Sequence, residues 1–257
     1  MFEDAEAYER MMGGWSRDVG RRFLAWLALP AGLRWLDVGC GTGAFTMELI
    51  ERAAPSAVCG VDPSAAQVAF ARVRPGAETA TFEVGSAESL PFEGDSFDVA
   101  VMALVIAFVP DPRRGVAEMA RVVRAGGTVA AYMWDLRRDG SPTGPLHAAV
   151  RAMGLAPAQP PSAAASTIDA MRALWTEAGL TDVETTEIRI AARHESFEAF
   201  WSVNTRGVGP AGAMVASLPD EVRARLRETL RESMHARPDG SVEHEAIANV
   251  VRGRVAR

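Results

Sequence analysis

The first half of the chain alternates short, mostly apolar runs with longer stretches whose apolar residues recur every three or four positions. Runs that are apolar at successive positions are typical of strands buried on both faces of a parallel sheet, and the longer spacing is typical of amphipathic helices. The strand-like runs are residues 33–38, 57–62, 79–85, 99–105 and 128–134. This alternation predicts an α/β fold with a Rossmann-like, doubly wound and mostly parallel sheet.

The second half of the chain has a less regular pattern. It predicts helices at residues 167–178, 196–204 and 218–234, strands at 183–191 and 243–251, and a Gly/Pro loop at 207–212. We expect the two strands to form an antiparallel C-terminal pair beside the parallel sheet. Between the halves, residues 136–166 are rich in Pro, Gly, Ala and Ser, with a short helix expected at 147–153.

The junction of the first predicted strand and helix contains three alternate glycines, Gly39, Gly41 and Gly43. A strand, a tight glycine turn and a helix open a doubly wound sheet, and the glycines let a ligand approach bare backbone. This spacing, with Ala44 as the last position, also fits a dinucleotide fingerprint. Asp37 favours another ligand, because its carboxylate repels a pyrophosphate and attracts a cationic or amino-bearing group.

The segment Leu36-Asp-Val-Gly-Cys-Gly-Thr-Gly43 resembles the first motif of class I S-adenosylmethionine (SAM)-dependent methyltransferases, and above all their type 11 or UbiE-like small-molecule subgroup. The resemblance implies SAM as the cofactor and an enzyme that moves its methyl group to a small, largely apolar acceptor by in-line substitution. A SAM-binding protein with a regulatory or other non-methyl-transfer role is the alternative. Asp37 disfavours a third possibility, an NAD-dependent oxidoreductase.

We expect a single methyltransferase domain over residues 1–257. Its parts are an N-terminal helical lid at 1–29, a SAM-binding half at 30–135, an insertion at 136–166 and a C-terminal half at 167–257 with a second lid segment at 196–215. Ser16 is expected to cap the helix of the N-terminal lid. In the family that the chain resembles, such an insertion often carries the acceptor pocket; a surface excursion is the competing interpretation.

The second predicted strand ends in Asp62, 23 residues after Gly39, where a carboxylate can accept hydrogen bonds from two ribose hydroxyls. By resemblance, the segment after Gly85 holds adenine, and Ser86 stands where an acid is usual. The small Ala103, at the tip of the fourth strand, allows the methionine part of SAM to approach. The predicted SAM site comprises Tyr8 of the lid, Asp37, Gly39, Gly41, Gly43, Asp62, Pro63, Ser86, Ala87 and Ala103.

Catalytic and acceptor residues are less clearly indicated. Many relatives carry a histidine in the turn after the fourth strand, but this chain has none in residues 106–110. Of the remaining histidines, His147 in the insertion is the candidate general base, with core packing as the competing role. The side chains expected to line the acceptor site are Trp15, Leu104, Trp134, His147 and Trp201.

Charge and cysteine usage narrow the possible partners. The formal net charge is −6 and the chain has no lysine, which argues against a nucleic-acid substrate. Cys40 and Cys59 lack the histidine spacing of a zinc site, so no metal is expected. No apolar run is long enough to span a membrane and the acidic N-terminus lacks signal-peptide features, so we expect a cytoplasmic location.

Overall fold

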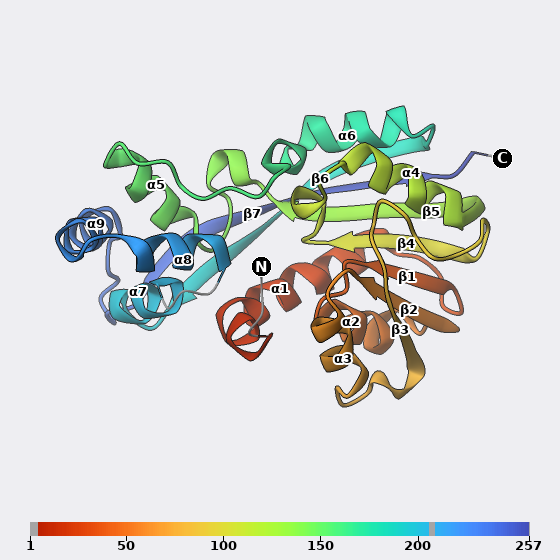
Figure 1. The fold of residues 1–257 in the computed structure, drawn as a ribbon, viewed down its shortest axis with the longest axis horizontal. Helices are drawn as coiled ribbons and strands as arrows, with labels where there is room; N and C mark the ends of the chain where they lie inside the picture. The colour runs from red at the N-terminus through yellow and green to blue at the C-terminus, as the bar shows by residue number, and fades with distance from the viewer. Residues whose placement is uncertain (1–4, 206–208, 257) are drawn as a thin grey trace.

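The structure, a computed structural model, describes the backbone of residues 5–205 and 209–256 and the side chains of residues 14–205 and 211–256. Its centre is a seven-stranded sheet in the order β3-β2-β1-β4-β5-β7-β6 (Figure 1). The strands are β1 Arg34–Val38, β2 Ala57–Asp62, β3 Ala80–Val84, β4 Phe97–Ala103, β5 Val123–Trp134, β6 Thr181–His194 and β7 Val242–Arg254. Strands β1 to β5 pair parallel, whereas β7 pairs antiparallel with both β5 and β6. The predicted fold class is therefore confirmed.

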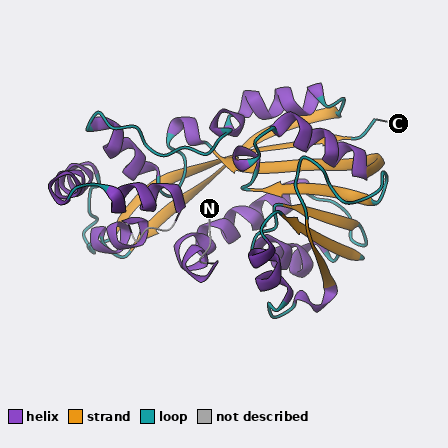
Figure 2. Ribbon diagram, in the orientation of Figure 1, coloured by secondary structure: helices purple, strands orange, loops and turns teal. Residues whose placement is uncertain are grey.

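Helices cover both faces of the sheet (Figures 1 and 2). Their bounds are α1 Ala5–Leu27, α2 Ala44–Ala53, α3 Ala65–Arg72, α4 Pro112–Val122, α5 Gly144–Ala152, α6 Ile168–Glu177, α7 Phe197–Thr205, α8 Gly209–Ser217 and α9 Asp220–Ser233. Helices α1, α2 and α3 lie on one face, and α4 and α6 on the other. The strand order reverses between β1 and β4, so their carboxyl ends flank the crevice where open α/β sheets bind ligands.

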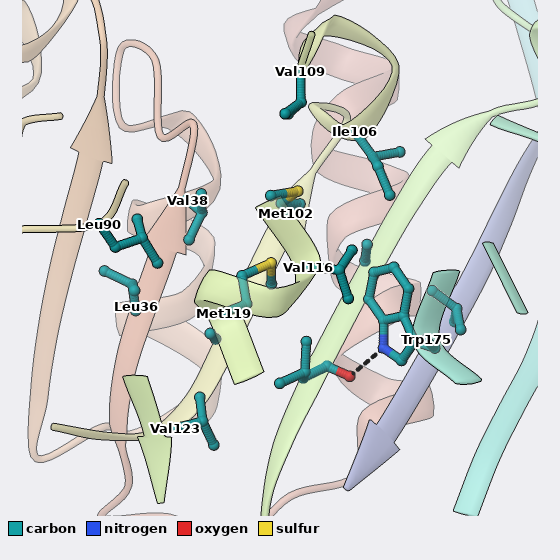
Figure 3. Packing of buried hydrophobic residues seen from close by; sticks show 14 of the residues in the cluster. Leu36, Val38, Leu90, Met102, Ile106, Val109, Val116, Met119, Val123 and Trp175 are labelled. Atoms are coloured by element: carbon teal, nitrogen blue, oxygen red, sulfur yellow. Dashed lines mark hydrogen bonds between the residues drawn. The ribbon is translucent and has the colours of Figure 1, made fainter. Parts of the chain in front are cut away.

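An apolar layer on each face holds the helices to the sheet. On the α4–α6 face, Trp175 is fully buried and its indole Nε1 donates a hydrogen bond to the Val129 carbonyl at 2.8 Å (Figure 3). On the α1–α2 face, the rings of Phe23, Phe45 and Tyr132 pack with centroids 4.8 to 6.0 Å apart. Each such aromatic side chain buries on the order of 150–250 Å², so these contacts fix α1 in place over the sheet.

The last two strands continue past the end of the parallel sheet. Strand β5 ends at Trp134, which pairs with Ala248, and beyond that point β7 pairs only with β6. We call this projecting ribbon, residues 189–194 and 242–247, together with α5, α7, α8 and α9, the distal arm (left in Figure 1). The distal arm has an apolar cluster of its own, which includes the fully buried Phe200.

The insertion at residues 136–166 is anchored at both ends by Asn249 of β7. Its amide nitrogen donates to Asp135 Oδ2 at 2.9 Å and to the Ser166 carbonyl at 2.8 Å. Burial opposes ionisation of Asp135, but hydrogen bonds from Asn249 and Arg138 outweigh it and lower the pKa of this carboxyl. A buried amide that holds both ends makes the insertion a fixed element of the fold rather than a loose excursion.

The predicted start of the N-terminal helix is wrong. Ser16 does not cap it, because α1 already begins at Ala5 and Ser16 lies within the helix. The residues before it, Tyr8, Met12 and Trp15, continue the three-to-four spacing of apolar positions. The spacing of the apolar positions therefore indicates where the helix begins better than the capping preference of one serine does.

Two expectations about the distal arm also need correction. The segment expected to be a Gly/Pro loop, 207–212, is helical from Gly209, where α8 begins; residues 206–208 lie outside the described residues. The proline of this segment falls in the first turn, where a missing N–H breaks no helical hydrogen bond. Helix α5 begins at Gly144, earlier than expected, with Pro145 in its first turn for the same reason.

Candidate active site

The turn between β1 and α2 has a left-handed backbone that glycine adopts most readily. Gly39, Gly41 and Gly43 have φ angles of +76°, +54° and +79°. A Cβ atom at Gly39 would lie only 2.5 Å from Val105 Cγ1, so a side chain there would both strain the backbone and clash. The Gly39 N–H donates to the Val61 carbonyl at 2.7 Å, which ties the turn to β2. The result is a fixed, backbone-lined wall.

The Asp62 carboxylate lies at the end of β2, beside this turn. It is 8% exposed, and its two oxygens accept one backbone hydrogen bond each, Oδ2 from Gly41 N–H at 3.0 Å and Oδ1 from Ser64 N–H at 2.9 Å. Each carboxylate oxygen has a second lone pair. The side chain is therefore held in one orientation and can still accept hydrogen bonds from two neighbouring hydroxyls of a ligand.

The Asp37 carboxyl, near the end of β1, is completely buried. Its Oδ2 accepts a hydrogen bond from Thr46 Oγ1 at 2.6 Å, whereas Oδ1 has no hydrogen-bond partner among the described residues. Burial, reinforced by the nearby negative charge of Asp62 and opposed by Thr46, raises the pKa of Asp37 from 3.8 to about 7. A cationic ligand group beside Oδ1 would favour the ionised form and reverse this shift.

The turn and both aspartates line a cavity of about 480 Å³, a size typical of small-molecule and cofactor sites. Nine of the predicted residues line it. They are Asp37, Gly39, Gly41, Asp62, Pro63, Ser86, Ala87 and Ala103, predicted for the cofactor, and Leu104, predicted for the acceptor. Their roles in binding remain predictions, but the structure brings them to one place.

The other predicted site residues lie elsewhere. Gly43 is the N-cap residue of α2, and the Tyr8 side chain lies outside the described residues. Trp15, Trp134, His147 and Trp201 belong to the described part of the chain but do not line the cavity. Their roles in an acceptor site remain predictions that this cavity does not support.

His147 lies in α5 of the distal arm and is 8% exposed. Burial lowers its pKa, the nearby Asp139 raises it and the nearby Arg151 lowers it, with a net decrease. Trp201 also lies in the distal arm, where its ring faces Phe197 at a centroid distance of 6.5 Å. Both side chains belong to the part of the fold that packs on the arm's own apolar cluster.

Several residues that line the cavity were not predicted. They include Ser16, Arg17, Phe45, Gln67 and Tyr132. Among the described residues that line the cavity, Arg17 is the one cation, set against the carboxyl groups of Asp37, Asp62, Glu48 and Glu88. The last two already have partners, since Glu48 pairs with an arginine at 2.8 Å and Glu88 accepts a backbone hydrogen bond at 3.0 Å.

Backbone strain marks the cavity wall at the tip of β4. Leu104, directly after β4, has φ +63°, a conformation that costs roughly 1–3 kcal/mol for a residue with a side chain. Its N–H donates to the Tyr132 carbonyl at 2.9 Å, which holds it there. Such strain is concentrated at functional sites, and here it turns the chain over the cavity at the tip of β4.

Comparison with known proteins finds sequence similarity in the part of the chain that carries the glycine turn and both aspartates. Residues 36–131 match the family model described as a methyltransferase domain. The 2-methyl-6-phytyl-1,4-hydroquinone methyltransferase 2 of Oryza sativa subsp. japonica is 43% identical over 95 residues, which are 37% of this chain and 27% of that protein. The ubiquinone/menaquinone biosynthesis C-methyltransferase UbiE of Geobacter sulfurreducens is 40% identical over 113 residues, 42% of this chain and 44% of that protein. The chain thus spans less than half the length of these two relatives.

The whole fold also has solved counterparts. The YcgJ protein from Bacillus subtilis superimposes with a TM-score of 0.59 over 95% of this chain and 99% of that one, at 18% sequence identity. Identity this low shows the fold alone.

Fold and sequence similarity agree for this part of the chain: residues 36–131 match a methyltransferase domain, belong to the parallel part of the sheet and supply the glycine turn and both aspartates of the cavity. The predicted resemblance to the type 11, UbiE-like methyltransferases is thus confirmed over residues 36–131 by the family match and by the named relatives. SAM is the cofactor of this family. The cavity fits it, because it offers a bare glycine wall, a carboxylate with free lone pairs and a second, partly unpartnered buried acid.

Two further properties concern the described residues only. Within them, no group of three or more His, Cys, Asp or Glu side chains is arranged to hold a metal ion. No helix in the described ranges combines the length and the apolar character needed to cross a bilayer.

Proposed function

We propose that this protein transfers the methyl group of SAM to a small, largely apolar acceptor. The observation that carries the proposal is the pair of buried carboxyl groups, Asp37 and Asp62, on either side of a glycine turn in one cavity. SAM presents a sulfonium, an ammonium group and two ribose hydroxyls. The unpartnered oxygen of Asp37 suits a cation, and the free lone pairs of Asp62 suit the hydroxyls.

The remaining cavity residues divide into two sides. Ser86 and Ala87 would lie beside adenine, as the family resemblance implies. At the tip of β4, Ala103, Leu104 and Phe108 would form the apolar side where an acceptor meets the methyl group. The family match ends at residue 131, before the distal arm, so the acceptor class rests on these apolar walls. The two named relatives act on hydroquinone or quinone precursors, according to their names, which agrees with an apolar acceptor.

Methyl transfer is an in-line substitution. The bond between sulfur and the methyl carbon breaks with its electron pair left on sulfur, which becomes a neutral thioether. An electron pair of the acceptor forms the new bond, and a protonated acceptor then releases its proton. The protein mainly aligns the reactants about 3–3.5 Å apart, an effect worth roughly 7–11 kcal/mol in well-oriented systems.

Calorimetric titration tests the proposal directly. We expect SAM and its demethylated product, S-adenosylhomocysteine (SAH), to bind, and NAD not to bind. Asp62→Asn should weaken SAM binding by on the order of tenfold or more, because a charge-assisted hydrogen bond contributes roughly 1.5–3 kcal/mol. The exposed Asp169 in the first turn of α6 provides the matched control, and Asp169→Asn should bind SAM like the wild type.

Turnover separates the enzyme from the alternative, a SAM-binding protein without methyl transfer. The protein should form SAH when it is incubated with SAM and a panel of phenols, amines and carbon acids. Tight SAM binding without SAH formation across the panel and a metabolite extract would support the alternative. Binding of NAD in place of SAM would overturn both.

We also propose a cytoplasmic location. The two cysteines, Cys40 and Cys59, are free and buried, which suits a reducing compartment. Cell fractionation with an antibody against the protein tests this, and recovery from an oxidising compartment would contradict it.

A further inference from the structure

The Asp37 carboxyl lies in a part of the sheet that gives it few groups to pair with. In the register of the sheet, Asp37 of β1 stands between Gly60 of β2 and Val101 of β4, neither of which has a polar side chain. The carboxyl is completely buried. Its Oδ2 accepts a hydrogen bond from Thr46 of α2 at 2.6 Å, and its Oδ1 has no partner among the described residues. An ionised carboxylate can accept about four hydrogen bonds, so a negative charge here is poorly compensated.

The charged and titratable groups around Asp37 favour its neutral form. Within the described ranges, the Asp62 carboxylate on β2 is the charged group that acts on Asp37 appreciably, and it is negative as well. The nearby thiols are neutral, because burial raises the pKa of both. In the wall of the same cavity, the acid of α2 is already paired with an arginine at 2.8 Å, and the arginine of α1 is exposed. These groups are, in chain order, Arg17, Cys40, Glu48, Arg52, Cys59 and Asp62.

The Asp37 carboxyl therefore holds a proton over much of the physiological pH range. Burial, opposed by the Thr46 hydroxyl and reinforced by Asp62, raises its pKa to about 7. Before a cation arrives, about half of the molecules thus carry a proton on Asp37 at pH 7, and about nine in ten do at pH 6. Asp37 must lose this proton before it can form an ion pair with a ligand.

We propose that the ammonium group in the methionine part of SAM displaces a proton from Asp37, so that cofactor binding releases a proton and weakens in acid. This inference rests on the proposed function and adds the regulation of the same site by pH. The proton leaves Asp37 for the solvent, and an N–H of the ammonium group then donates a hydrogen bond to the freed carboxylate. No covalent bond to carbon or sulfur changes in this exchange.

The ammonium group fits this exchange better than the sulfonium does. An ammonium nitrogen carries three N–H donors, and its hydrogen bond to a carboxylate is roughly twice as strong as one between neutral groups. The sulfonium has three carbon substituents and no N–H or O–H to donate. Because Oδ1 of Asp37 is buried without a hydrogen-bond partner among the described residues, a cation that also donates satisfies both of its needs.

The exchange fixes the sign and the size of the pH effect. SAM binds the ionised form of Asp37, so its affinity should rise with pH and level off above the pKa of about 7. We expect the affinity to fall about fivefold from pH 7 to pH 6, and about tenfold more from pH 6 to pH 5.

Calorimetric titration with SAM at pH 6, in two buffers of different ionisation enthalpy, counts the protons released. The difference in measured heat, divided by the difference in ionisation enthalpy, gives the number of protons per bound SAM. We expect about 0.9, because about that share of the Asp37 carboxyl is protonated at this pH. A value near zero, or an affinity that is the same at pH 5 and pH 7, would overturn the inference.

Two further ligands identify the displacing group. SAH keeps the ammonium group but has a neutral thioether, so it should release as many protons as SAM. In contrast, 5′-methylthioadenosine has no ammonium group, and it should bind without proton release and with the same affinity at pH 5 and pH 7. Proton release with SAM alone would assign the exchange to the sulfonium and contradict the role of the ammonium group.

Three substitutions assign the proton to Asp37. Asp37→Asn should abolish the proton release and flatten the pH dependence, with weaker SAM binding at pH 7. Thr46→Val removes the hydrogen bond that favours the ionised carboxylate, so it should move the midpoint of the affinity profile to higher pH. The matched control, Asp62→Asn, should weaken SAM binding but keep most of the proton release. Proton release that persists in Asp37→Asn contradicts the assignment.

Titrations at pH 7 keep two failures apart. A protein that binds neither SAM nor SAH at this pH refutes the proposed function. A protein that binds both without releasing a proton refutes only the exchange at Asp37. Should Asp37→Asn fail to fold, the wild-type measurements in two buffers and the shift in Thr46→Val still decide.

Discussion

The cofactor cavity and the distal arm each keep a buried polar atom without a hydrogen-bond partner among the described residues, but the two groups are chemical opposites. In the cavity this atom is Oδ1 of Asp37, an acid; in the distal arm it is Nε2 of His194, a base. Burial raises the pKa of Asp37 to about 7 and lowers the pKa of His194 to about 4. In both places the uncharged form is favoured away from water.

The contrast indicates which kind of ligand group each of the two side chains can bind. Asp37 has a pKa near neutrality, so an arriving sulfonium or ammonium group ionises it easily and then pairs with it. His194 stays neutral in the same pH range and can only exchange hydrogen bonds. The two side chains thus differ in what they can pair with, a cation at Asp37 and a hydrogen-bonding group at His194.

The largest expected effect comes from Asp37→Asn. The folded-state pKa of about 7 lies above the usual 3.8, so the stability contributed by Asp37 is fully present below about pH 4 and is lost as the pH rises to about 7. Three pKa units set an upper limit of about 4 kcal/mol. Urea unfolding should show the wild type losing stability over this range relative to Asp37→Asn. A constant cost of the new amide cancels in the comparison.

His194→Gln should change the pH dependence of stability in the opposite direction. The folded-state pKa of His194 lies below the usual 6.5, so its contribution is present above that pH and is lost as the pH falls toward 4. The variant should therefore be relatively more stable at acid pH, and Asp37→Asn at neutral pH. If both variants change the free energy of unfolding in the same pH range, the contrast between Asp37 and His194 is wrong.

The next effect compares a glycine of the glycine turn, Gly39, with Gly154, which follows α5. Gly39 and Gly154 have nearly equal φ angles, +76° and +75°, but a Cβ at Gly154 would meet nothing within 4 Å. Gly154→Ala should cost the backbone strain alone, roughly 1–2 kcal/mol. Gly39→Ala adds the clash with Val105, on the order of 1–3 kcal/mol more. Thermal unfolding and SAM titration measure both.

Relief of the clash provides the control. In a Val105→Ala background, Gly39→Ala should lose most of its extra cost and keep the strain, whereas Gly154→Ala should be unchanged. Only Gly39→Ala should also abolish SAM binding. Equal costs for the two substitutions would mean that the turn is not the rigid wall described above.

The cofactor half was predictable because its ligand-facing groups are fixed locally. Asp37, Gly39 and Gly41 follow one buried strand and Asp62 ends the next, and parallel pairing of β1 with β2 brings these strand ends together. Arg17 was missed because the face that α1 turns to the cavity depends on tertiary packing. No periodicity in the sequence specifies that packing. Tyr132 was missed because β5 is buried at successive positions, so its pattern does not distinguish the two faces of the sheet.

The distal arm was less predictable for a related reason. The predicted strand 183–191 stops before His194, whereas β6 continues to it, supported by antiparallel pairing with β7. That register places His194 diagonally opposite His244, a contact that depends on exact strand ends. His147 was favoured because it lies in the insertion, but Asn249 fixes where that insertion runs, and a single amide leaves no pattern in the sequence.

The smallest expected effect concerns Arg17, which lies on α1 between the two places compared here. Arg17→Gln should weaken SAM binding by at most about fivefold, because exposed ion pairs contribute roughly 0–1 kcal/mol. The proposed partner of its guanidinium is the carboxylate of the methionine part, since the other charged groups that line the cavity, as far as the structure describes them, are acids. Calorimetry at low and high salt measures the effect, which should shrink as salt screens the pair.

A ligand without the carboxylate decides whether this explanation holds. The loss in Arg17→Gln should appear with both SAM and SAH but not with 5′-methylthioadenosine, which lacks the amino-acid part. Arg21, one turn further along α1, does not line the cavity, so Arg21→Gln should leave all three affinities unchanged. An equal loss with 5′-methylthioadenosine would mean that Arg17 only stabilises α1. In that case, the Arg17 guanidinium would have no part in holding the cofactor.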